Sequence, residues 1–242
     1  MKIALLGYGR MGKAIERVAR EQGHQIVLKM DVDNREKCTD EMLKAADVAI
    51  DFSVPSVAVE HYKWCFDNGI PVVSGTTGWL EQWEEVVEYC RQKNGGFFYA
   101  SNFSVGVNLF FHLNRYLAKM MSGFRNYKVY VEETHHIHKL DAPSGTAITL
   151  AEGILKNHTD YTSWELAGGA ETGDHVLPVT AKREGEVPGI HAITYKSEVD
   201  EIKICHAAFS REGFAQGAVM AAEFMQGKTG LYGMDELLQV EK

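Results

Sequence analysis

Six residues near the start of the chain, Gly7-Tyr8-Gly9-Arg10-Met11-Gly12, form a complete G-x-G-x-x-G pattern between an apolar run and an amphipathic stretch. In such a loop the first Gly permits a tight turn, the second lets the backbone approach a pyrophosphate, and the third allows close packing of helix on strand. The helix that follows presents free N–H groups to phosphates. The pattern therefore predicts a dinucleotide-binding βαβ unit, with a merely structural tight turn as the alternative.

The first hundred residues alternate short apolar runs with amphipathic stretches. Continuously apolar runs such as 48–50 and 71–73 are typical of parallel strands that helices cover on both faces. This rhythm predicts an α/β fold with an N-terminal Rossmann-like, doubly wound parallel sheet. Strands are expected at 2–6, 25–31, 47–52, 71–74 and 97–100, and helices at 11–22, 55–68 and 79–93.

The rhythm changes after about residue 105. Residues 190–196 and 202–208 roughly alternate apolar and polar side chains around a polar connection, which is typical of an antiparallel hairpin with one packed face. With a strand expected at 127–134 and a helix at 146–155, the segment predicts an α+β domain with a mixed, largely antiparallel sheet. Helical spacing returns after residue 213. We therefore expect residues 1–106 and 212–242 to form the dinucleotide-binding domain and residues 107–211 to form a second domain.

Charge and composition exclude several classes of protein. The formal net charge is −8 and no basic run is present, so a nucleic-acid partner is not expected. The apolar runs are short and no basic leader precedes them, so neither a signal peptide nor a membrane span is expected. The four cysteines are widely spaced and form no Cys-x-x-Cys pair, which indicates reduced thiols in a cytoplasmic protein.

Asp31 lies at the end of the second expected strand, nineteen residues beyond Gly12. An acid at this place accepts hydrogen bonds from the adenosine ribose hydroxyls. Val32 follows it, and no Arg stands immediately beside it to neutralise a 2′-phosphate, although Lys29 and Arg35 are nearby. The sequence therefore favours NADH weakly over NADPH. The alternative is a solvated Asp in a turn at the end of the strand.

Two further loops follow expected strands. They are Gly75-Thr76-Thr77-Gly78 and Ser101-Asn102-Phe103-Ser104. In an open parallel sheet, ligands bind beyond the carboxyl ends of the strands, so both loops are placed for the nicotinamide end of a cofactor. The same residue types also occur in ordinary turns for backbone reasons.

The segment richest in reactive side chains is residues 132–147, where three His and an Asp lie within seven residues. A metal site is one interpretation. In a continuing strand, however, His135 and His136 point to opposite faces, Lys139 adds a cation, and no Cys or Glu-x-x-His frame accompanies them. We therefore expect no metal. A second interpretation is a polar strand end, because His and Lys are common on exposed edges.

A proton-donating anion site is the third interpretation of this segment, and the one we favour. His and Lys supply protons near neutral pH when their pKa values are tuned. Ser144 is well placed as a helix N-cap, which leaves the N–H groups of Gly145 and Thr146 open to a carboxylate. In an acidic chain, one concentrated cationic pocket suits a small anionic substrate.

Residues 135–147, His-His-x-His-Lys-x-Asp-Ala-Pro-Ser-Gly-Thr-Ala, resemble the signature of the dihydrodipicolinate reductase family, also named 4-hydroxy-tetrahydrodipicolinate reductases, of bacterial and plant lysine biosynthesis. Other segments are similar to further blocks of that family in the same order and extend the resemblance over nearly the whole chain. These segments are residues 9–12, 51–53, 75–78, 102–108, 183–185, 189–191 and 210–215.

This resemblance implies an NAD(P)H-dependent oxidoreductase of lysine and diaminopimelate biosynthesis. The enzyme would reduce 4-hydroxy-tetrahydrodipicolinate, via dihydrodipicolinate, to tetrahydrodipicolinate, which makes its substrate a small dianion. The resemblance also implies a homotetramer whose second domain both binds substrate and builds the oligomer, with hinges at residues 102–108 and at Ser210-Arg211.

The resemblance also assigns roles position by position. His135 is implied as the proton donor and Lys139 as its catalytic partner. The residues implied to bind substrate are His136, Ser144, Gly145 and Thr146. Those implied to line the cofactor are Gly7, Tyr8, Gly9, Arg10, Met11, Gly12, Asp31, Gly75, Thr76, Thr77, Ala100, Ser101, Asn102 and Phe103.

Two other functions compete with this one. The first is another two-domain Rossmann enzyme, such as an amino-acid or amine dehydrogenase that acts on a related imine. The second is a non-catalytic NADH-sensing protein, which would retain the glycine loop but lose the His-Lys segment. Both segments are intact in this sequence, which favours the enzyme.

Overall fold

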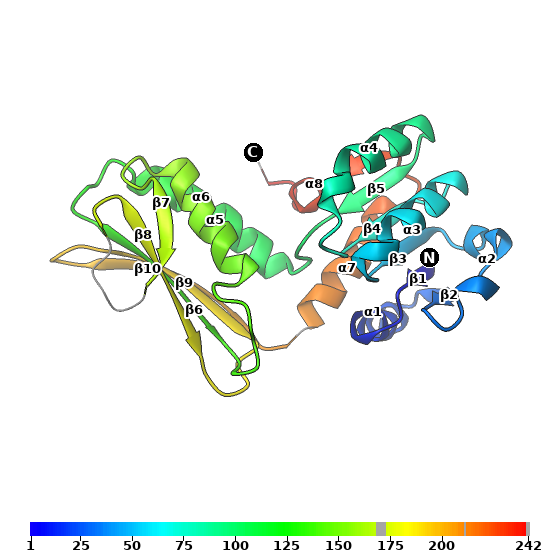
Figure 1. The fold of residues 1–242 in the computed structure, drawn as a ribbon, viewed down its shortest axis with the longest axis horizontal. Helices are drawn as coiled ribbons and strands as arrows, with labels where there is room; N and C mark the ends of the chain where they lie inside the picture. The colour runs from blue at the N-terminus through cyan, green and yellow to red at the C-terminus, as the bar shows by residue number, and fades with distance from the viewer. Residues whose placement is uncertain (168–172, 211, 241–242) are drawn as a thin grey trace. The chain divides into compact units, whose positions relative to one another are not determined.

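The computed structural model describes residues 1–167, 173–210 and 212–240, and the chain divides into two compact units (Figure 1). Unit 1 consists of Met1–Val105 and Glu212–Lys242, and unit 2 of Gly106–Arg211. Arg211, expected at a hinge, lies outside the described residues. No helix in the described part of the chain has the length and apolar character needed to cross a membrane.

Unit 1 contains a six-stranded sheet in the order β11-β5-β4-β3-β1-β2, in which every pairing is parallel. This confirms the predicted Rossmann-like sheet. The apolar runs form its central strands because both of their faces are covered: all residues of β3 are buried. The strands are β1 (Lys2–Leu6), β2 (Gln25–Met30), β3 (Val48–Asp51), β4 (Val72–Ser74), β5 (Gly96–Tyr99) and β11 (Gly230–Tyr232).

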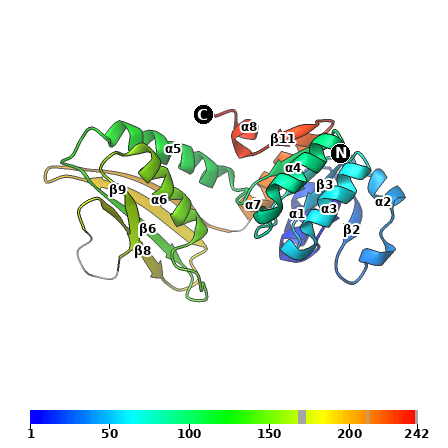
Figure 2. The same cartoon turned by 45° about the horizontal axis from the view of Figure 1, so that its top comes forward.

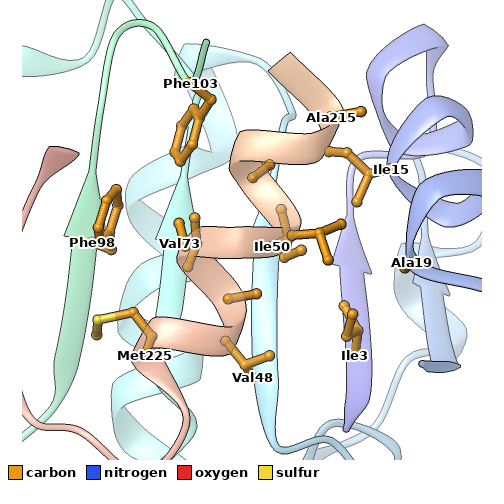
Figure 3. Close-up of a cluster of buried hydrophobic side chains, with 14 of the residues drawn as sticks. Ile3, Ile15, Ala19, Val48, Ile50, Val73, Phe98, Phe103, Ala215 and Met225 are labelled. Carbon is orange, nitrogen blue, oxygen red and sulfur yellow. The ribbon is translucent and has the colours of Figure 1, made fainter. Parts of the chain in front are cut away.

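Helices cover both faces of this sheet. On one face, α1 (Arg10–Glu21) and α7 (Glu212–Met225) pack on the sheet, and Figure 3 shows Ala215 and Met225 of α7 among Ile3, Ile50 and Phe98 of the strands. Side chains from the helices Asp40–Lys44, Pro55–Asp67 and Trp83–Gln92 pack on the opposite face, whereas those of Met234–Leu238 pack on the same face as α1 and α7. The remaining elements of unit 1 are η1 (Arg35–Lys37), α2 (Asp40–Lys44), α3 (Pro55–Asp67), η2 (Leu80–Gln82), α4 (Trp83–Gln92) and α8 (Met234–Leu238).

Unit 2 contains a five-stranded sheet in the order β10-β9-β6-β8-β7. The predicted hairpin is present as β9 and β10, and β9 also pairs antiparallel with β6. The pairings of β6 with β8 and of β8 with β7 are parallel. The sheet is therefore mixed, as predicted, but only half of its pairings are antiparallel. Its strands are β6 (Lys128–His135), β7 (Ser163–Leu166), β8 (Val176–Arg183), β9 (Gly189–Lys196) and β10 (Glu201–Ala208).

Two helices, α5 (Val105–Met121) and α6 (Gly145–Asn157), cover one face of this second sheet (Figure 2). Leu117 of α5 and Leu150 of α6 are buried with Val129, Val131 and other strand residues in one apolar cluster. The connection from β6 to α6 contains the His-rich segment, so the two elements that carry it are fixed by this core.

Candidate active site

Unit 1 has a cavity of about 330 Å³ at the carboxyl ends of its central strands. The glycine loop forms one wall and the loop after β4 forms another, which brings together two segments that the sequence predicted to bind a cofactor. The lining residues are Gly9, Arg10, Met11, Phe52, Ser53, Pro55, Gly75, Thr76 and Thr77.

The glycine loop has the shape that a dinucleotide requires. A Cβ on Gly7 (φ +92°) would lie 2.4 Å from the Phe52 carbonyl oxygen, and one on Gly12 would lie 2.3 Å from the Gly7 carbonyl oxygen. These positions pack strand, turn and helix. A Cβ on Gly9, by contrast, would meet no heavy atom within 4 Å. Gly9 is the N-cap of α1, so its open side and the first-turn N–H groups fit a pyrophosphate.

The loop after β4 is held by a buried carboxylate, Asp51, at the end of β3. Asp51 Oδ1 accepts from the Thr76 hydroxyl at 2.5 Å and from the Ser53 hydroxyl at 3.0 Å. Its Oδ2 lies 2.7 Å from His61 Nδ1 on α3. We call Asp51, Ser53, His61 and Thr76 the Asp51 cluster. It fixes two cavity-lining residues, and Gly75 is needed beside it because a Cβ there would lie 2.3 Å from the Phe52 ring.

Asp31 lies directly after β2, where the Gly7 N–H donates to the Met30 carbonyl at 2.9 Å. Its Oδ1 accepts from the Val32 N–H at 2.9 Å, and its own N–H donates to Asn34 Oδ1 at 2.8 Å. The turn that was the alternative interpretation is thus present. The side chain is exposed beside the glycine loop, so the turn is compatible with an acid that faces a ribose.

The two basic residues nearest Asp31 in the sequence are both ion-paired. Lys29 Nζ donates to both oxygens of Glu16 at 3.2 Å and lies 4.8 Å from the centroid of the Tyr8 ring. Arg35 pairs with Glu60 on α3. Burial raises the pKa of Glu16, but hydrogen bonds from Tyr8, Arg20 and Lys29 outweigh it and lower the pKa to about 2. Glu16 is therefore charged at neutral pH and holds Lys29.

Residues 100–103 follow β5, as expected, but do not line the cavity. Phe103 is buried and packs against Phe52 and Phe98. A Cβ on Gly217 of α7 would lie 1.7 Å from the Phe103 carbonyl oxygen, so helix and turn are in close contact. Phe103 supports the Phe52 side of the cavity.

In unit 2, His135 is the last residue of β6 and is buried. Its Nδ1 lies 3.3 Å from Oε2 of Glu133, two residues earlier on the same strand and fully buried. His191 Nε2 of β9 lies 3.6 Å from the same oxygen. Arg183 Nη2 of β8 donates to the other oxygen at 3.2 Å, and the Ser144 backbone N–H donates to the carboxylate at 3.1 Å. These five residues are the Glu133 cluster.

The carboxylate at the centre of this cluster is held as an anion. Burial raises the pKa of Glu133, but the contacts from His135, His191 and Ser144 outweigh burial and hold the pKa far below the usual range. Glu133, His135 and His191 also place one potential metal-binding atom each within 4.8 Å of one another. This is a different set of side chains from the one weighed in the sequence.

Lys139 and His136 lie in the connection after β6, each half-buried. Lys139 Nζ donates to both carboxylate oxygens of Asp141 at 2.8 Å. Arg183 anchors this connection by donating to the Lys139 and Asp141 carbonyl oxygens at 3.3 and 2.6 Å. Arg183 thus ties the segment that carries Lys139 to the buried carboxylate beside His135.

Ser144 is the N-cap of α6, as predicted, and its hydroxyl accepts from the Ala147 N–H at 3.2 Å. The hydroxyl also lies 3.2 Å from His191 Nε2. Gly145 and Thr146 begin the helix, and a Cβ on Gly145 would meet no heavy atom within 4 Å. Because the first-turn N–H groups have no partner within the helix, this end of α6 fits a carboxylate.

Two groups of site residues were missed as such from the sequence. Phe52, Ser53 and Pro55 line the cavity because they follow β3, the strand between β1 and β4, which is a positional signal that the sequence does contain. Glu133 and its partners from β8 and β9 were assigned no role, because their contacts depend on strand register, which the sequence did not reveal.

Comparisons with known proteins agree with this arrangement. Residues 1–103 match the family model described as dihydrodipicolinate reductase, N-terminus, and residues 106–238 match the one described as dihydrodipicolinate reductase, C-terminus. The 4-hydroxy-tetrahydrodipicolinate reductase of Christiangramia forsetii is 50% identical over 238 residues, which cover 98% of each chain. That of Neisseria meningitidis serogroup B is 32% identical, over 98% of this chain and 97% of the relative.

Solved structures share the fold. A dipicolinate-bound dihydrodipicolinate reductase from Paenisporosarcina sp. TG-14 superposes with a TM-score of 0.77 at 21% identity over 98% of each chain. A dehydrogenase from Thermotoga maritima, described as probable, reaches 0.57 at 11% identity, over 98% of this chain and 93% of the other. With both family models matched in order across the whole architecture, this chain belongs to the dihydrodipicolinate reductase family.

Proposed function

We propose that the protein is an NAD(P)H-dependent reductase that converts 4-hydroxy-tetrahydrodipicolinate, via dihydrodipicolinate, to tetrahydrodipicolinate. A single observation carries this proposal. One chain of this family contains both a glycine loop shaped to hold a dinucleotide and an anion site with a buried His. The curated relatives at 50% and 32% identity bear the name of this activity. Both half-sites are retained here, which favours a catalyst over a cofactor sensor.

The cofactor, when bound, supplies the hydride. The residues of unit 1 hold and orient it. The first turn of α1 and the open side of Gly9 take the pyrophosphate, because free N–H groups and the helix dipole favour phosphate there. Gly75, Thr76 and Thr77 face the nicotinamide end from the loop that the Asp51 cluster fixes.

The residues of unit 2 bind the dianion and deliver a proton. The N–H groups of Gly145 and Thr146 hold one carboxylate at the start of α6, and the side chains of His136 and Lys139 bind the other, for which Lys139 exchanges its ion pair with Asp141. His135 protonates the ring carbon next to the one that receives hydride, a form of general acid catalysis that typically contributes roughly 10²- to 10⁴-fold. Lys139 assists by balancing charge on the substrate.

We propose a preference for NADH over NADPH. Asp31 faces the adenosine end, and Val32 follows it with no cation. The two nearby cations, Lys29 and Arg35, are engaged by Glu16 and Glu60. A 2′-phosphate would meet the Asp31 carboxylate, which accepts only from the Val32 N–H among the contacts described for its side chain, and no free cation among these side chains, so electrostatics favours the hydroxyl.

We also propose that the enzyme is a cytoplasmic homotetramer assembled through the sheet of unit 2. Support comes from the resemblance to the family and from three large apolar side chains that this sheet leaves exposed, Tyr130, Leu166 and Ile202. All four cysteines are free, as suits a reducing compartment. Light scattering that gives the mass of one chain would rule the tetramer out.

A coupled absorbance assay tests the reductase. Substrate is generated from pyruvate and aspartate semialdehyde by the synthase that makes it, and oxidation of NADH or NADPH is followed. We expect oxidation that requires both the substrate and an intact His135. Tight NADH binding without oxidation would instead indicate another imine substrate or a sensor.

A further inference from the structure

Glu133 is a fully buried carboxylate, although Glu side chains are usually exposed to solvent. It lies on β6 two residues before His135, so the two side chains share one face of the strand. Burying a charge this completely is costly unless other groups compensate it. The Glu133 cluster supplies that compensation from three strands and the N-cap of α6, so four separate elements converge on one carboxylate.

The cluster is better suited to proton chemistry than to a metal ion, although three of its atoms have ligand spacing. The Arg183 guanidinium already donates to Glu133 Oε1, and a divalent cation bound there would lie beside a fixed positive charge. The Ser144 N–H occupies the carboxylate as well. His135 and His191 are therefore the two rings that lie against this carboxylate.

The two ring nitrogens of His135 have different surroundings. Nδ1 is buried, makes no hydrogen bond of standard geometry among the described residues, and faces Glu133 Oε2 at 3.3 Å. Nε2 lies beside Gly189 at the start of β9, where a Cβ would come within 3.0 Å of it. The Gly189 backbone therefore approaches the ring so closely that a side chain there would crowd it. Because Nδ1 lies beside the carboxylate, Nε2 is the nitrogen that remains for a substrate.

We propose that Glu133 is a positioning residue whose buried charge, 3.3 Å from His135 Nδ1, keeps a proton on that nitrogen, so that Nε2–H is the bond that breaks when the substrate is protonated. This inference rests on the proposed function of His135. The electron pair of the reduced ring takes the Nε2 proton, a C–H bond forms, and His135 is left neutral with its proton on Nδ1. Solvent then restores the Nε2 proton, while Glu133 remains ionised throughout.

Three other groups face this pair and are part of its charge balance. Arg183 on β8 stays positive, the His191 ring on β9 lies 3.6 Å from the same carboxylate oxygen, and the Ser144 N–H at the start of α6 is a fixed donor. Arg183 stays positively charged in the variant. Removal of the Glu133 charge would therefore leave Arg183 and a protonated His135 with no anion between them. Protonated His135 is then disfavoured.

The test compares Glu133→Gln with Glu132→Gln. Gln keeps the shape of Glu133 and an oxygen for the Ser144 N–H, but it removes the charge. Glu132 is the neighbouring carboxylate on β6, half-exposed and paired with Lys182 at 2.7 Å, so it controls for loss of a charge on this strand. We expect kcat of Glu133→Gln to fall at least about tenfold, as when the orienting carboxylate of a catalytic His is lost, with KM for NADH within about twofold.

Two readouts separate positioning from a structural role. The alkaline limb of the kcat–pH profile should move to lower pH in Glu133→Gln and stay in place in Glu132→Gln. In the ligand-free protein, at a pH high enough for His135 to be neutral, 15N NMR of the histidines should show His135 as the Nδ1–H tautomer in the wild type and a larger Nε2–H fraction in Glu133→Gln. An unchanged tautomer and pH profile, with or without a lower kcat, would overturn the proposal.

The NMR readout does not depend on turnover, so it separates this inference from the proposed function. An inactive wild type with the expected tautomer change would contradict the reductase alone. If Glu133→Gln does not fold, Glu133→Asp is used with Glu132→Asp as its control, since it keeps the charge but draws it away from His135. A wild-type kcat and tautomer in Glu133→Asp would likewise overturn the proposal.

Discussion

Each unit of this protein buries one carboxylate beside its binding site, and the two are used differently. Asp51 in unit 1 and Glu133 in unit 2 are the only buried Asp or Glu side chains among the described residues, and both are fully inaccessible to solvent. Both lie at or near the carboxyl end of a strand and contact a His. They differ in their remaining partners.

Asp51 is surrounded by groups that carry no permanent charge, the hydroxyls of Ser53 and Thr76 and the ring of His61. Glu133 is surrounded by the fixed cation of Arg183 and by two His rings. The first arrangement fixes the shape of a loop, and the second also sets a charge. From this comparison we infer that unit 1 contributes geometry to the proposed reaction, while unit 2 contributes protons.

The largest expected effect tests the chemical half of this comparison. His135→Gln removes the proposed proton donor, and we expect kcat to fall by roughly 10²- to 10⁴-fold, with the Kd of NADH unchanged. His138→Gln is the matched control, because His138 belongs to the same segment but is exposed, pairs with Glu186 at 3.1 Å, and has its ring centroid 6.1 Å from that of His136. Stopped-flow turnover and NADH fluorescence titration measure the two quantities. Equal losses in both would make His135 structural.

The second effect tests the geometric half. Asp51→Asn removes a charge that holds Ser53 and Thr76, and a hydrogen bond to a charged group is worth about 1.5–3 kcal/mol. We expect the Kd of NADH to rise about tenfold or more, while kcat at saturating NADH stays within about twofold. Asp47→Asn is the control, since Asp47 lies at the opposite end of β3, where it accepts from the Lys2 N–H. A lower kcat at unchanged NADH affinity would break the comparison.

The sequence revealed unit 1 more fully than unit 2 for a physical reason. The strands of a parallel sheet that is buried on both faces have continuously apolar sequences, which can be recognised without a structure. The glycine loop then identifies the strand before it as the first strand of a dinucleotide-binding unit. The cavity-lining loops then follow from strand ends alone. Short elements such as η1 and α2 carried no such signal, because a one-turn helix has no period to detect.

In unit 2 the local features could be predicted and the long-range contacts could not. The N-cap at Ser144 depends on neighbouring residues only, so its sequence sufficed. Glu133, by contrast, meets Arg183 and His191 because β6 lies between β8 and β9 in a particular register, which pairs Glu133 with His191 and His135 with Arg183. A shift of one residue would direct Glu133 to the other face.

A third prediction concerns stability at acidic pH. The pKa of Glu133 is well below the 4.5 of an unperturbed Glu, so the unfolded chain binds its proton at higher pH than the folded protein does. The stability that Glu133 contributes is therefore complete above about pH 5 and is lost as pH falls, at a slope of up to about 1.4 kcal/mol per pH unit. Urea unfolding between pH 3 and 6 should show a shallower slope for Glu133→Gln than for Glu132→Gln. Parallel slopes would mean that the cluster does not hold this carboxylate ionised.

The smallest effect concerns Glu16 and Lys29 at the edge of unit 1, where solvent weakens the interaction between their charges. Glu16→Gln removes the partner of Lys29, whose ammonium is then free to meet a 2′-phosphate. Surface ion pairs are worth up to about 1 kcal/mol, so we expect KM for NADPH to fall about three- to fivefold while KM for NADH stays constant. Glu21→Gln serves as control, because Glu21 lies on the same helix and pairs with Arg17 instead.

Asp31→Ala completes this test because it should change KM for NADH, whereas Glu16→Gln should change KM for NADPH. It should raise KM for NADH more than KM for NADPH, since only the ribose of NADH offers a 2′-hydroxyl to the carboxylate. If Asp31→Ala raised KM for NADH and Glu16→Gln lowered KM for NADPH, unit 1 would select its cofactor through the Asp31 carboxylate and through the ion pair that holds Lys29. If Asp31→Ala weakened both cofactors alike, the ribose assignment would be wrong, and Asp31 would serve only the turn with Asn34. The edge of unit 1 would then contribute shape alone, as the Asp51 cluster does.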